Sequence, residues 1–243
     1  MLKEYLSKVD PRTKDAFFAA LTDALKEETR LFVVTANPET LMLAEKTPAL
    51  SDALLDPETV IVPDGIGVVR AAESLARPIH ERVPGVEISE HLLREADGLN
   101  KRVFLYGASD ETLTALQARV QREWPNAQLV GAKNGYDFDD DQVMDEIAAL
   151  SPDVVLVALG IPRQETLLHR HLGRFQKGVF VGVGGSFDVL SGKVRRAPLL
   201  FQKLGLEWLW RILRSPSRLK RFLSSNLPFL AAVRRLKKEN RKQ

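Results

Sequence analysis

The sequence contains no cysteine, which excludes a disulfide framework, a cysteine-based zinc site and thiol catalysis. It has no apolar stretch long enough to span a bilayer. The absence of cysteine also favours a cytoplasmic setting. The opening stretch MLKEYLSKVDPRTKD lacks the apolar core of a signal peptide, so we expect none. Internal repeats are absent as well. What remains is a globular protein of 243 residues, enough for one large α/β domain plus an appendage.

Several functional fingerprints are also missing. The glycine-rich segment that begins at Gly182 does not match the spacing G-x-G-x-x-G, and no Gly-Lys-Ser/Thr follows a glycine-rich loop. These absences argue against a nicotinamide enzyme and against a P-loop protein. His169 and His171 lie close together, but no acid or third ligand completes a metal pattern, so we expect no metal site and no cofactor.

The sequence does contain apolar, β-branched runs that end in Gly, Asn, Asp or Pro. LFVV leads into Thr35, VIV leads into Pro63 and Asp64, and VFVGV leads into Gly184. Such runs, each followed by helical periodicity, predict strands that deliver their carboxyl ends to a turn. We therefore expect an α/β fold with a Rossmann-like, open, mostly parallel sheet flanked by helices.

The expected elements alternate along the chain. Strands are predicted at residues 31–35, 59–62, 102–106, 128–131, 154–159 and 179–183. Helices are predicted at about residues 11–28, 38–46, 66–75, 86–97, 110–123, 139–150 and 163–171. Asn37 and Asp110 are the expected N-caps of two of these helices.

Beyond Pro198 the pattern changes to helices only, with breaks expected near Ser215-Pro216 and Leu227-Pro228. We expect residues 1–202 to form the core and residues 203–243 to form a basic, amphipathic, helical appendage. Arg and Lys greatly outnumber acids in this appendage, although the net charge of the chain is only +3. Such a local excess indicates an anionic partner.

The segment that begins at Leu206 interleaves Trp and Leu with Arg at helical spacing, a pattern typical of a membrane interface. An ordinary helix that packs its apolar face on the core fits the same pattern. A single-stranded nucleic-acid binder would also combine aromatic and basic residues. That alternative leaves the polar strand ends unexplained, so we expect no nucleic acid as a partner.

Polar residues at the predicted strand ends are candidates for chemistry, and each has a structural alternative. Asp64 suits a general base on a fixed scaffold, or an N-cap of the next helix. Asn37 could hydrogen-bond to a ligand hydroxyl, but taken alone it fits better as the N-cap of the following helix. Gln164 could face a ligand from the turn after its strand, or it could be a solvated residue in the first turn of the next helix. The loop from Gly182 to Asp188 could hold a phosphate on its backbone amides.

Taken in order, the motifs resemble those of the WecG/TagA/CpsF glycosyltransferase family, glycosyltransferase family 26. The resemblance covers about residues 35–221. The second position of the motif T-x-N-P-E is often Pro in the family and is Ala36 here. The collinear motifs are T-x-N-P-E, P-D-G-I-G, E-R-V-P-G, L-Y-G, G-x-P-R-Q-E, G-V-G-G-S-F-D, K-V-R-R-A-P and G-L-E-W-L-W-R.

The resemblance implies an inverting, metal-independent transfer of a sugar from a UDP-sugar donor to a polyprenyl-diphosphate-linked sugar. N-acetylmannosamine is the sugar expected from the family, with its uronic acid, glucose and glucuronate left open. The expected location is the inner face of the plasma membrane, where the appendage meets anionic lipid. A homo-oligomer is also left open.

The resemblance also implies roles for particular residues. Asp64 is expected to be the catalytic base. Residues that line the sugar site or contact donor or acceptor are expected to be Thr35, Asn37, Arg82 and Gln164. The UDP side is expected to involve Tyr136 and Asp188. The basic appendage that completes the site contains Arg211, Arg218 and Arg221, and one of these three arginines is expected to meet the diphosphate, which one being left open.

Overall fold

The computed structural model describes residues 1–79, 81–215 and 217–240, without the side chains of Lys203, Arg211, Arg218, Arg221 and Asn240. In these residues six parallel strands form one sheet in the order β2-β1-β6-β5-β3-β4. The expected parallel α/β fold is therefore confirmed. The strands are β1 (Arg30–Ala36), β2 (Thr59–Pro63), β3 (Arg102–Gly107), β4 (Gln128–Lys133), β5 (Val154–Ala158) and β6 (Gly178–Gly182).

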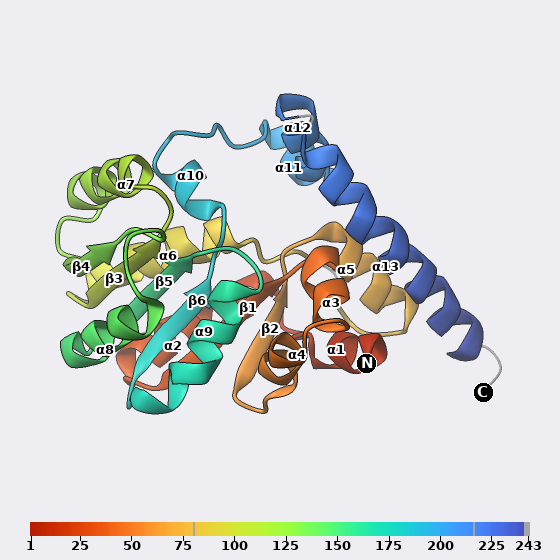
Figure 1. Ribbon diagram of the computed structural model, residues 1–243, viewed down its shortest axis with the longest axis horizontal. Coiled ribbons are helices and arrows are strands. Elements are labelled where there is room, and N and C mark those ends of the chain that lie inside the picture. Colours follow the sequence, from red (N-terminus) through yellow and green to blue (C-terminus); the bar gives the residue numbers. More distant parts are fainter. Residues whose placement is uncertain (80, 216, 241–243) are drawn as a thin grey trace.

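Helices cover both faces of the sheet (Figure 1). One face is covered by α1 (Leu2–Lys8), α3 (Pro38–Ala44), α4 (Pro48–Leu55), α5 (Ile66–Ser74), α8 (Asp140–Leu150), α9 (Arg163–His171), the short 3-10 helix η1 (Leu172–Arg174) and α13 (Arg218–Asn240). The other face is covered by α2 (Lys14–Lys26), α6 (Gly85–Gly98), α7 (Asp110–Glu123) and α10 (Ser186–Leu190). Two further short helices are α11 (Leu199–Lys203) and α12 (Glu207–Arg214).

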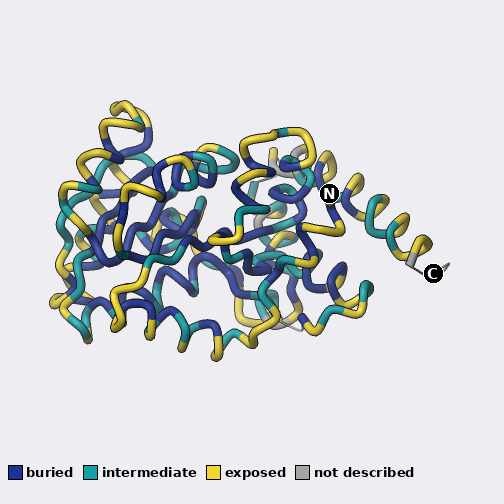
Figure 2. The backbone as a smooth tube through the Cα atoms, turned by 90° about the horizontal axis from the view of Figure 1, so that it is seen from below, coloured by how far each residue is buried: buried dark blue, intermediate teal, exposed yellow. Residues whose placement is uncertain are grey.

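The central strands alternate between the two helical layers. Phe32 and Val34 of β1 join the hydrophobic cluster on one face, whereas Val33 joins the cluster on the other. All three side chains are fully buried. Successive side chains of a strand point to opposite faces, so a strand buried on both sides has to be apolar throughout. Figure 2 shows the buried chain running through the middle of the molecule.

Most expected elements are present within a few residues of their predicted bounds. Two helices, α1 and α4, were not predicted, and both contribute buried leucines to the core. The expected cap of α7 is wrong by one residue, because the Ser109 hydroxyl, not Asp110, accepts from the Thr112 amide. The carboxylate of Asp110 instead accepts a hydrogen bond of 2.7 Å from the side-chain amide of Asn134.

Of the two breaks predicted in the C-terminal helical segment, one is confirmed and the other is wrong. α12 ends at Arg214 and α13 begins at Arg218, while Pro216 lies outside the described residues. The break expected at Leu227-Pro228 is wrong, since α13 continues through Pro228. Proline removes one helical hydrogen bond, but Pro228 is exposed and the next residue, Phe229, is buried against the core. Burial of this ring holds the two halves of the helix in line.

Phe229 anchors α13 close to the carboxyl edge of the sheet. Its side chain is 1% exposed, and α13 packs along α3 (Figure 1). A Cβ atom built on Gly67 would lie 2.9 Å from Pro38 Cγ and 3.8 Å from Phe229 Cε1. The C-terminal helix thus seals the place where α3 and α5 leave the sheet, and glycine at position 67 permits that close approach.

We predict that Phe229→Ala releases α13 from α3. Removing a buried phenylalanine ring typically costs about 3–5 kcal/mol, because apolar contacts are lost and a cavity remains. Limited trypsin digestion should then cleave within residues 218–240 while the sheet stays folded by circular dichroism. Leu230→Ala is the matched control, because Leu230 is 48% exposed on the same helix and should change little. Equal cleavage of the two variants would contradict the anchoring role.

Candidate active site

The carboxyl ends of β1, β2 and β6 bring several candidate residues together. The Thr35 hydroxyl donates a hydrogen bond of 2.9 Å to the carbonyl of Gly182, joining β1 to β6. The Asp64 amide donates to the Ala36 carbonyl at 2.9 Å, which joins the turn after β2 to β1. A Cβ on Gly85 would lie 3.6 Å from Thr35 Oγ1, so the N-terminus of α6 also reaches this corner.

The structure shows which of the two expected helix caps forms, at Asn37 and not at Asp64. Asn37 caps α3, because its Oδ1 atom accepts from the amides of Glu39 (2.8 Å) and Thr40 (3.1 Å). Only its Nδ2 group is left to serve a ligand. Asp64 does not occupy the N-cap position of α5, which Gly65 takes. Its side chain is half-buried at the end of β2, where a carboxylate can act on a ligand held over the sheet edge.

Gln164 does not point outward as a solvated first helical turn would. Its side chain is 2% exposed, and its Oε1 atom accepts from the amides of Gly160 and Gly184, both at 3.1 Å. This amide group ties the loop after β5 to the loop after β6. Because the Gly184 amide is used in this way, the glycine-rich loop has one donor fewer for a phosphate than we expected from the sequence.

Beside Gln164 lies a fully buried acid, Glu165. Its Oε1 atom accepts a hydrogen bond of 2.7 Å from Gln164 Nε2, while its Oε2 atom has no hydrogen-bond partner among the described residues. Burial raises the pKa of Glu165 to about 7, and the hydrogen bond from Gln164 opposes that rise. At neutral pH this carboxyl group therefore exchanges a proton between its charged and neutral forms.

Tyr136 follows β4, at the far end of the strand order, and Asp188 lies in α10 after β6, on the side of Thr112 of α7. Tyr136 is 77% exposed on a turn held by Asn134, whose Oδ1 atom accepts from the Tyr136 amide at 2.9 Å. Asp188 accepts a long hydrogen bond of 3.4 Å from the Thr112 hydroxyl. Nearby, Lys193 donates to Glu111 Oε2 at 2.7 Å, and this pairing is the chief cause that raises the pKa of Lys193.

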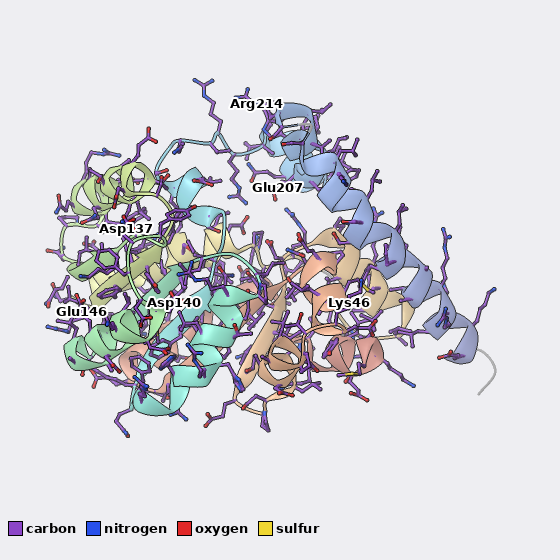
Figure 3. All side chains as sticks on the ribbon, in the orientation of Figure 1. Lys46, Asp137, Asp140, Glu146, Glu207 and Arg214 are labelled. Carbon is purple, nitrogen blue, oxygen red and sulfur yellow. The ribbon has the colours of Figure 1, made fainter. Side chains whose placement is uncertain are left out.

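An ion pair supports the turn that carries Tyr136. Arg163 donates to both carboxylate oxygens of Asp140, at 2.8 Å and 2.7 Å, and to the carbonyl of Gly135 at 2.8 Å. The hydroxyl of Tyr106 donates to the same carboxylate, and burial together with this charge raises the pKa of Tyr106. Arg163 is exposed, yet its contacts with Asp140 and Gly135 also support the framework of the edge. Figure 3 shows Asp137 and Asp140 in this half of the molecule.

Arg82 lies beside the end of β2 but is paired with an acid. The next residue, Val83, donates its amide to the Pro63 carbonyl at 2.8 Å. Arg82 Nη2 donates to Glu207 Oε2 at 2.7 Å, and Arg196 Nε donates to Glu207 Oε1 at 3.2 Å. Three sequence motifs therefore meet at one carboxylate. Figure 3 shows Glu207 on the inner side of α12.

The C-terminal segment covers the turn that carries Asp64. A Cβ on Gly205 would lie 3.1 Å from Ile66 Cγ1, so the bend between α11 and α12 rests on the first residue of α5. The backbones of Arg211, Arg218 and Arg221 belong to α12 and α13. Their side chains lie outside the described part of the structure, so their expected contact with a diphosphate stays a prediction.

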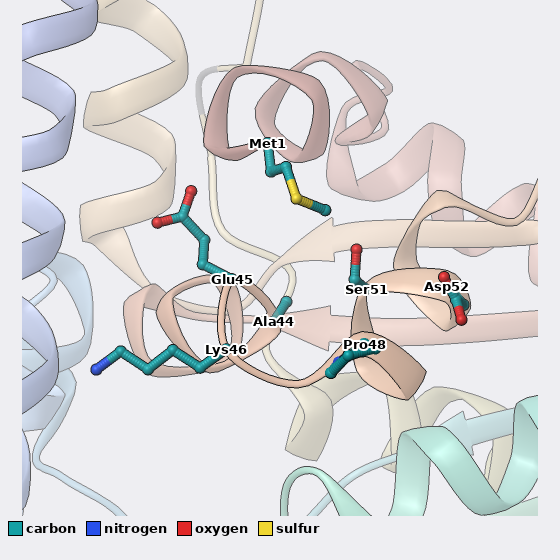
Figure 4. A pocket seen from close by; sticks show the side chains of 7 residues that line it. All are labelled: Met1, Ala44, Glu45, Lys46, Pro48, Ser51 and Asp52. Carbon is teal, nitrogen blue, oxygen red and sulfur yellow. The ribbon is translucent and has the colours of Figure 1, made fainter.

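Two other features bear on the site. Among the described residues no group of three or more His, Cys, Asp or Glu side chains could hold a metal ion. A surface pocket at the other end of α3 is lined by Met1, Ala44, Glu45, Lys46, Pro48, Ser51 and Asp52 (Figure 4). It contains none of the candidate residues, so we do not connect it with the chemistry at the sheet edge.

Sequence reasoning missed three residues of this edge: Glu165, Arg196 and Glu207. Each lies within one of the ordered motifs, and Glu165 directly follows Gln164, a residue that was given a role. Charged side chains in amphipathic or turn segments are usually solvated, so their burial could not be predicted from spacing. The only available signal was their position inside the ordered motifs.

The fold and the polar residues at the strand ends are those of an α/β enzyme that acts on a ligand at the carboxyl edge of a parallel sheet. The model of the Glycosyl transferase WecG/TagA/CpsF family matches residues 5–243. The chain therefore belongs to this family and is a glycosyltransferase. The family resemblance inferred from the motifs is confirmed.

Named relatives are similar over most of the chain. The N-acetylglucosaminyldiphosphoundecaprenol N-acetyl-beta-D-mannosaminyltransferase of Bacillus spizizenii strain W23 is 42% identical over 203 residues, 84% of this chain and 79% of the relative. The protein of the same name from Bacillus subtilis strain 168 is 40% identical, covering 79% of this chain and 75% of the relative. That of Staphylococcus aureus strain MW2 is 35% identical, covering 87% and 83%.

We predict that Glu165 makes folding stability fall as the pH rises. The unfolded chain releases this proton near pH 4.5, whereas the folded protein keeps it until about pH 7. The stabilisation is therefore present below pH 4.5 and is lost as the pH rises through 7. Its size is on the order of a few kcal/mol.

Glu165→Gln should abolish this dependence and raise stability at pH 8, because a neutral amide needs no proton. Urea midpoints of both proteins at pH 5, 6, 7 and 8 check the expectation. Glu146→Gln, at an exposed acid on α8, is the control and should keep the wild-type slope. Parallel pH profiles for wild type and Glu165→Gln would show that Glu165 is not the group responsible.

Proposed function

We propose that this glycosyltransferase moves N-acetylmannosamine from a UDP-sugar to N-acetylglucosaminyl-diphosphoundecaprenol at a membrane surface. The observation that carries the proposal is the identity of 35–42% to relatives named for this transfer, over 79–87% of the chain. The convergence of the motif residues at one sheet edge supports it. Polymers of the cell surface, including teichoic acids, are the products to which such a transfer contributes.

In the proposed reaction a hydroxyl of the acceptor sugar attacks the anomeric carbon of the donor. The new C–O bond forms as the bond to the UDP oxygen breaks, and UDP leaves with the electron pair. The carboxylate of Asp64 takes the proton of the attacking hydroxyl. Attack from the face opposite the leaving group inverts the configuration at that carbon.

The two halves of the edge suit the two parts of the donor. Thr35, Asn37 and Gln164 lie near Asp64 and would border the sugar. Tyr136 offers an exposed ring on which a base can stack, since stacking on aromatic side chains holds bases of any kind. Asp188 provides an acceptor for the N–H group of a uracil ring on the same side.

Charge builds up on the diphosphate as UDP leaves, and arginine suits its stabilisation because the guanidinium fork matches phosphate oxygens. We propose that Arg211, Arg218 and Arg221 of the C-terminal helices supply this charge. With this charge in place, the transfer would require no bound metal. We therefore expect turnover in the presence of EDTA.

We also propose that residues 203–243 attach the enzyme to the inner face of the plasma membrane. No helix in the described part of the chain is long and apolar enough to cross a bilayer. α13 nevertheless exposes leucines at a spacing of three or four residues, on a different side from Phe229. These leucines are Leu219, Leu223, Leu227 and Leu230. Basic residues continue toward the helix end and would attract anionic lipid.

A donor panel tests the function. UDP-N-acetylmannosamine, its uronic acid, UDP-glucose and UDP-glucuronate are each offered with a lipid-diphosphate N-acetylglucosamine acceptor in EDTA, and products are read by mass. We expect transfer from UDP-N-acetylmannosamine. Asp64→Asn should lower turnover about a hundred- to ten-thousand-fold without changing UDP binding by calorimetry. Transfer from another UDP-sugar instead would show that the proposed donor is wrong. Turnover close to wild type in Asp64→Asn would show that Asp64 is not the base.

Vesicle binding tests the membrane role. We expect the protein to sediment with phosphatidylglycerol vesicles more than with phosphatidylcholine vesicles, and less so at high salt, because screening weakens the basic attraction. Leu227→Glu should weaken binding, since it places a charge within the leucine stripe of α13. Leu227→Met retains the apolar surface and is the control. Vesicle binding that changes neither with lipid charge nor with Leu227→Glu would contradict the proposal.

A further inference from the structure

A buried carboxylate joins the C-terminal helices to the core. Glu207, the first residue of α12, is 6% exposed. Its oxygens accept from Arg82 (2.7 Å) and Arg196 (3.2 Å), whose side chains are 15% and 23% exposed. Arg82 precedes α6 and Arg196 follows α10. One side chain therefore holds together three segments that are far apart in the sequence.

The ion pairs continue into the core. Arg196 also donates to Glu87 of α6, and Lys14 of α2 donates to the other oxygen of Glu87 at 3.1 Å. The chain of alternating charges thus runs from Lys14 through Glu87, Arg196 and Glu207 to Arg82. Each of the three inner charges, Glu87, Arg196 and Glu207, has two partners, so Glu207 connects α12 to a network of ion pairs that extends to α2 and α6.

The environment keeps Glu207 ionised. Burial by itself would raise its pKa, but the charges and hydrogen bonds of Arg82 and Arg196 outweigh burial and hold the pKa below its usual value. Loss of this charge would leave two partly buried guanidinium groups without their shared partner, which is costly in a desolvated setting. An exposed surface ion pair would have little such effect.

The position of Glu207 matters for the proposed reaction. Arg82 lies next to the residue whose amide binds the end of β2, and Gly205 rests on Ile66 of the turn that carries Asp64. Arg211 follows Glu207 by four residues in α12, about one helical turn. The docking of Glu207 therefore sets where the backbone of α12 stands above the Asp64 turn.

We propose that Glu207 is a positioning residue, which through Arg82 and Arg196 holds α12 over the carboxyl edge of the sheet in the geometry that sugar transfer requires. Its catalytic consequence rests on the proposed transferase function. The docking of α12 does not, and it can be measured without any substrate.

The test compares Glu207→Gln, which removes the charge at nearly constant shape, with Glu207→Asp, which retains it. Glu58→Gln is the matched control, because Glu58 also binds an arginine through both oxygens, at 2.8 Å each, but its side chain is 60% exposed and it lies in the turn before β2. Arg196→Gln breaks the same contact from the other side, and it keeps the test decisive if Glu207→Gln does not fold.

Docking is read from tryptophan fluorescence. Two of the three tryptophans, Trp208 and Trp210, lie on α12, and the third is Trp124. In a Trp124→Phe background the signal therefore comes from α12 alone. Quenching by acrylamide, which is uncharged, then reports how far this helix is exposed, independently of the charge changed by each variant.

We expect Glu207→Gln and Arg196→Gln to increase acrylamide quenching, with Glu207→Asp intermediate and Glu58→Gln unchanged. In the donor assay, kcat of Glu207→Gln should fall at least about tenfold, with partial recovery in Glu207→Asp. Unchanged quenching in both Glu207→Gln and Arg196→Gln would overturn the docking role. Increased quenching with wild-type kcat would overturn the role in catalysis. A donor panel without any transfer would refute the proposed function but leave the quenching result standing.

Discussion

The parallel hydrogen bonding of the six strands is the constraint on which the other features depend. Parallel pairing from β2 to β4 places all carboxyl ends on one edge, where the chain turns into the following helices. Residues as distant as Asp64 and Gln164 become neighbours of the same edge for this reason alone. A central apolar sheet, buried by helices on both faces, then makes that edge a fixed platform for polar groups.

The polar groups of the edge divide into those that build it and those left for chemistry. Backbone groups of neighbouring strands and turns are hydrogen-bonded by the side chains of Thr35, Asn37 and Gln164. These side chains therefore hold in place the loops that would border a ligand. Such support is what a transferase needs, because a base contributes only when it is held within hydrogen-bond reach of the reacting hydroxyl.

The C-terminal helices complete the edge from a part of the chain that contributes no strand. They dock by apolar contacts, through Phe229 beside Gly67, and by charge, through Glu207 between two arginines. The two kinds of contact have different consequences. Apolar burial is largely insensitive to direction, whereas paired charges require one geometry. Docking by both means joins a helical surface with exposed leucines to the proposed site of sugar transfer.

Local pattern was sufficient for the class of fold, the six strands and most helices, because strand burial and helix periodicity are encoded in neighbouring residues. The ordered motifs were likewise sufficient for the family. Pattern failed at Pro228, where the burial of Phe229 overrides a local helix breaker, and at α1 and α4, whose short apolar runs gain stability only from packing. It could not reveal that Arg82 is paired with Glu207 or that Glu165 is buried. The Arg82–Glu207 pair joins residues more than a hundred positions apart in the sequence. The burial of Glu165 depends on every element that packs around it. Only the assembled sheet and its covering helices determine either one.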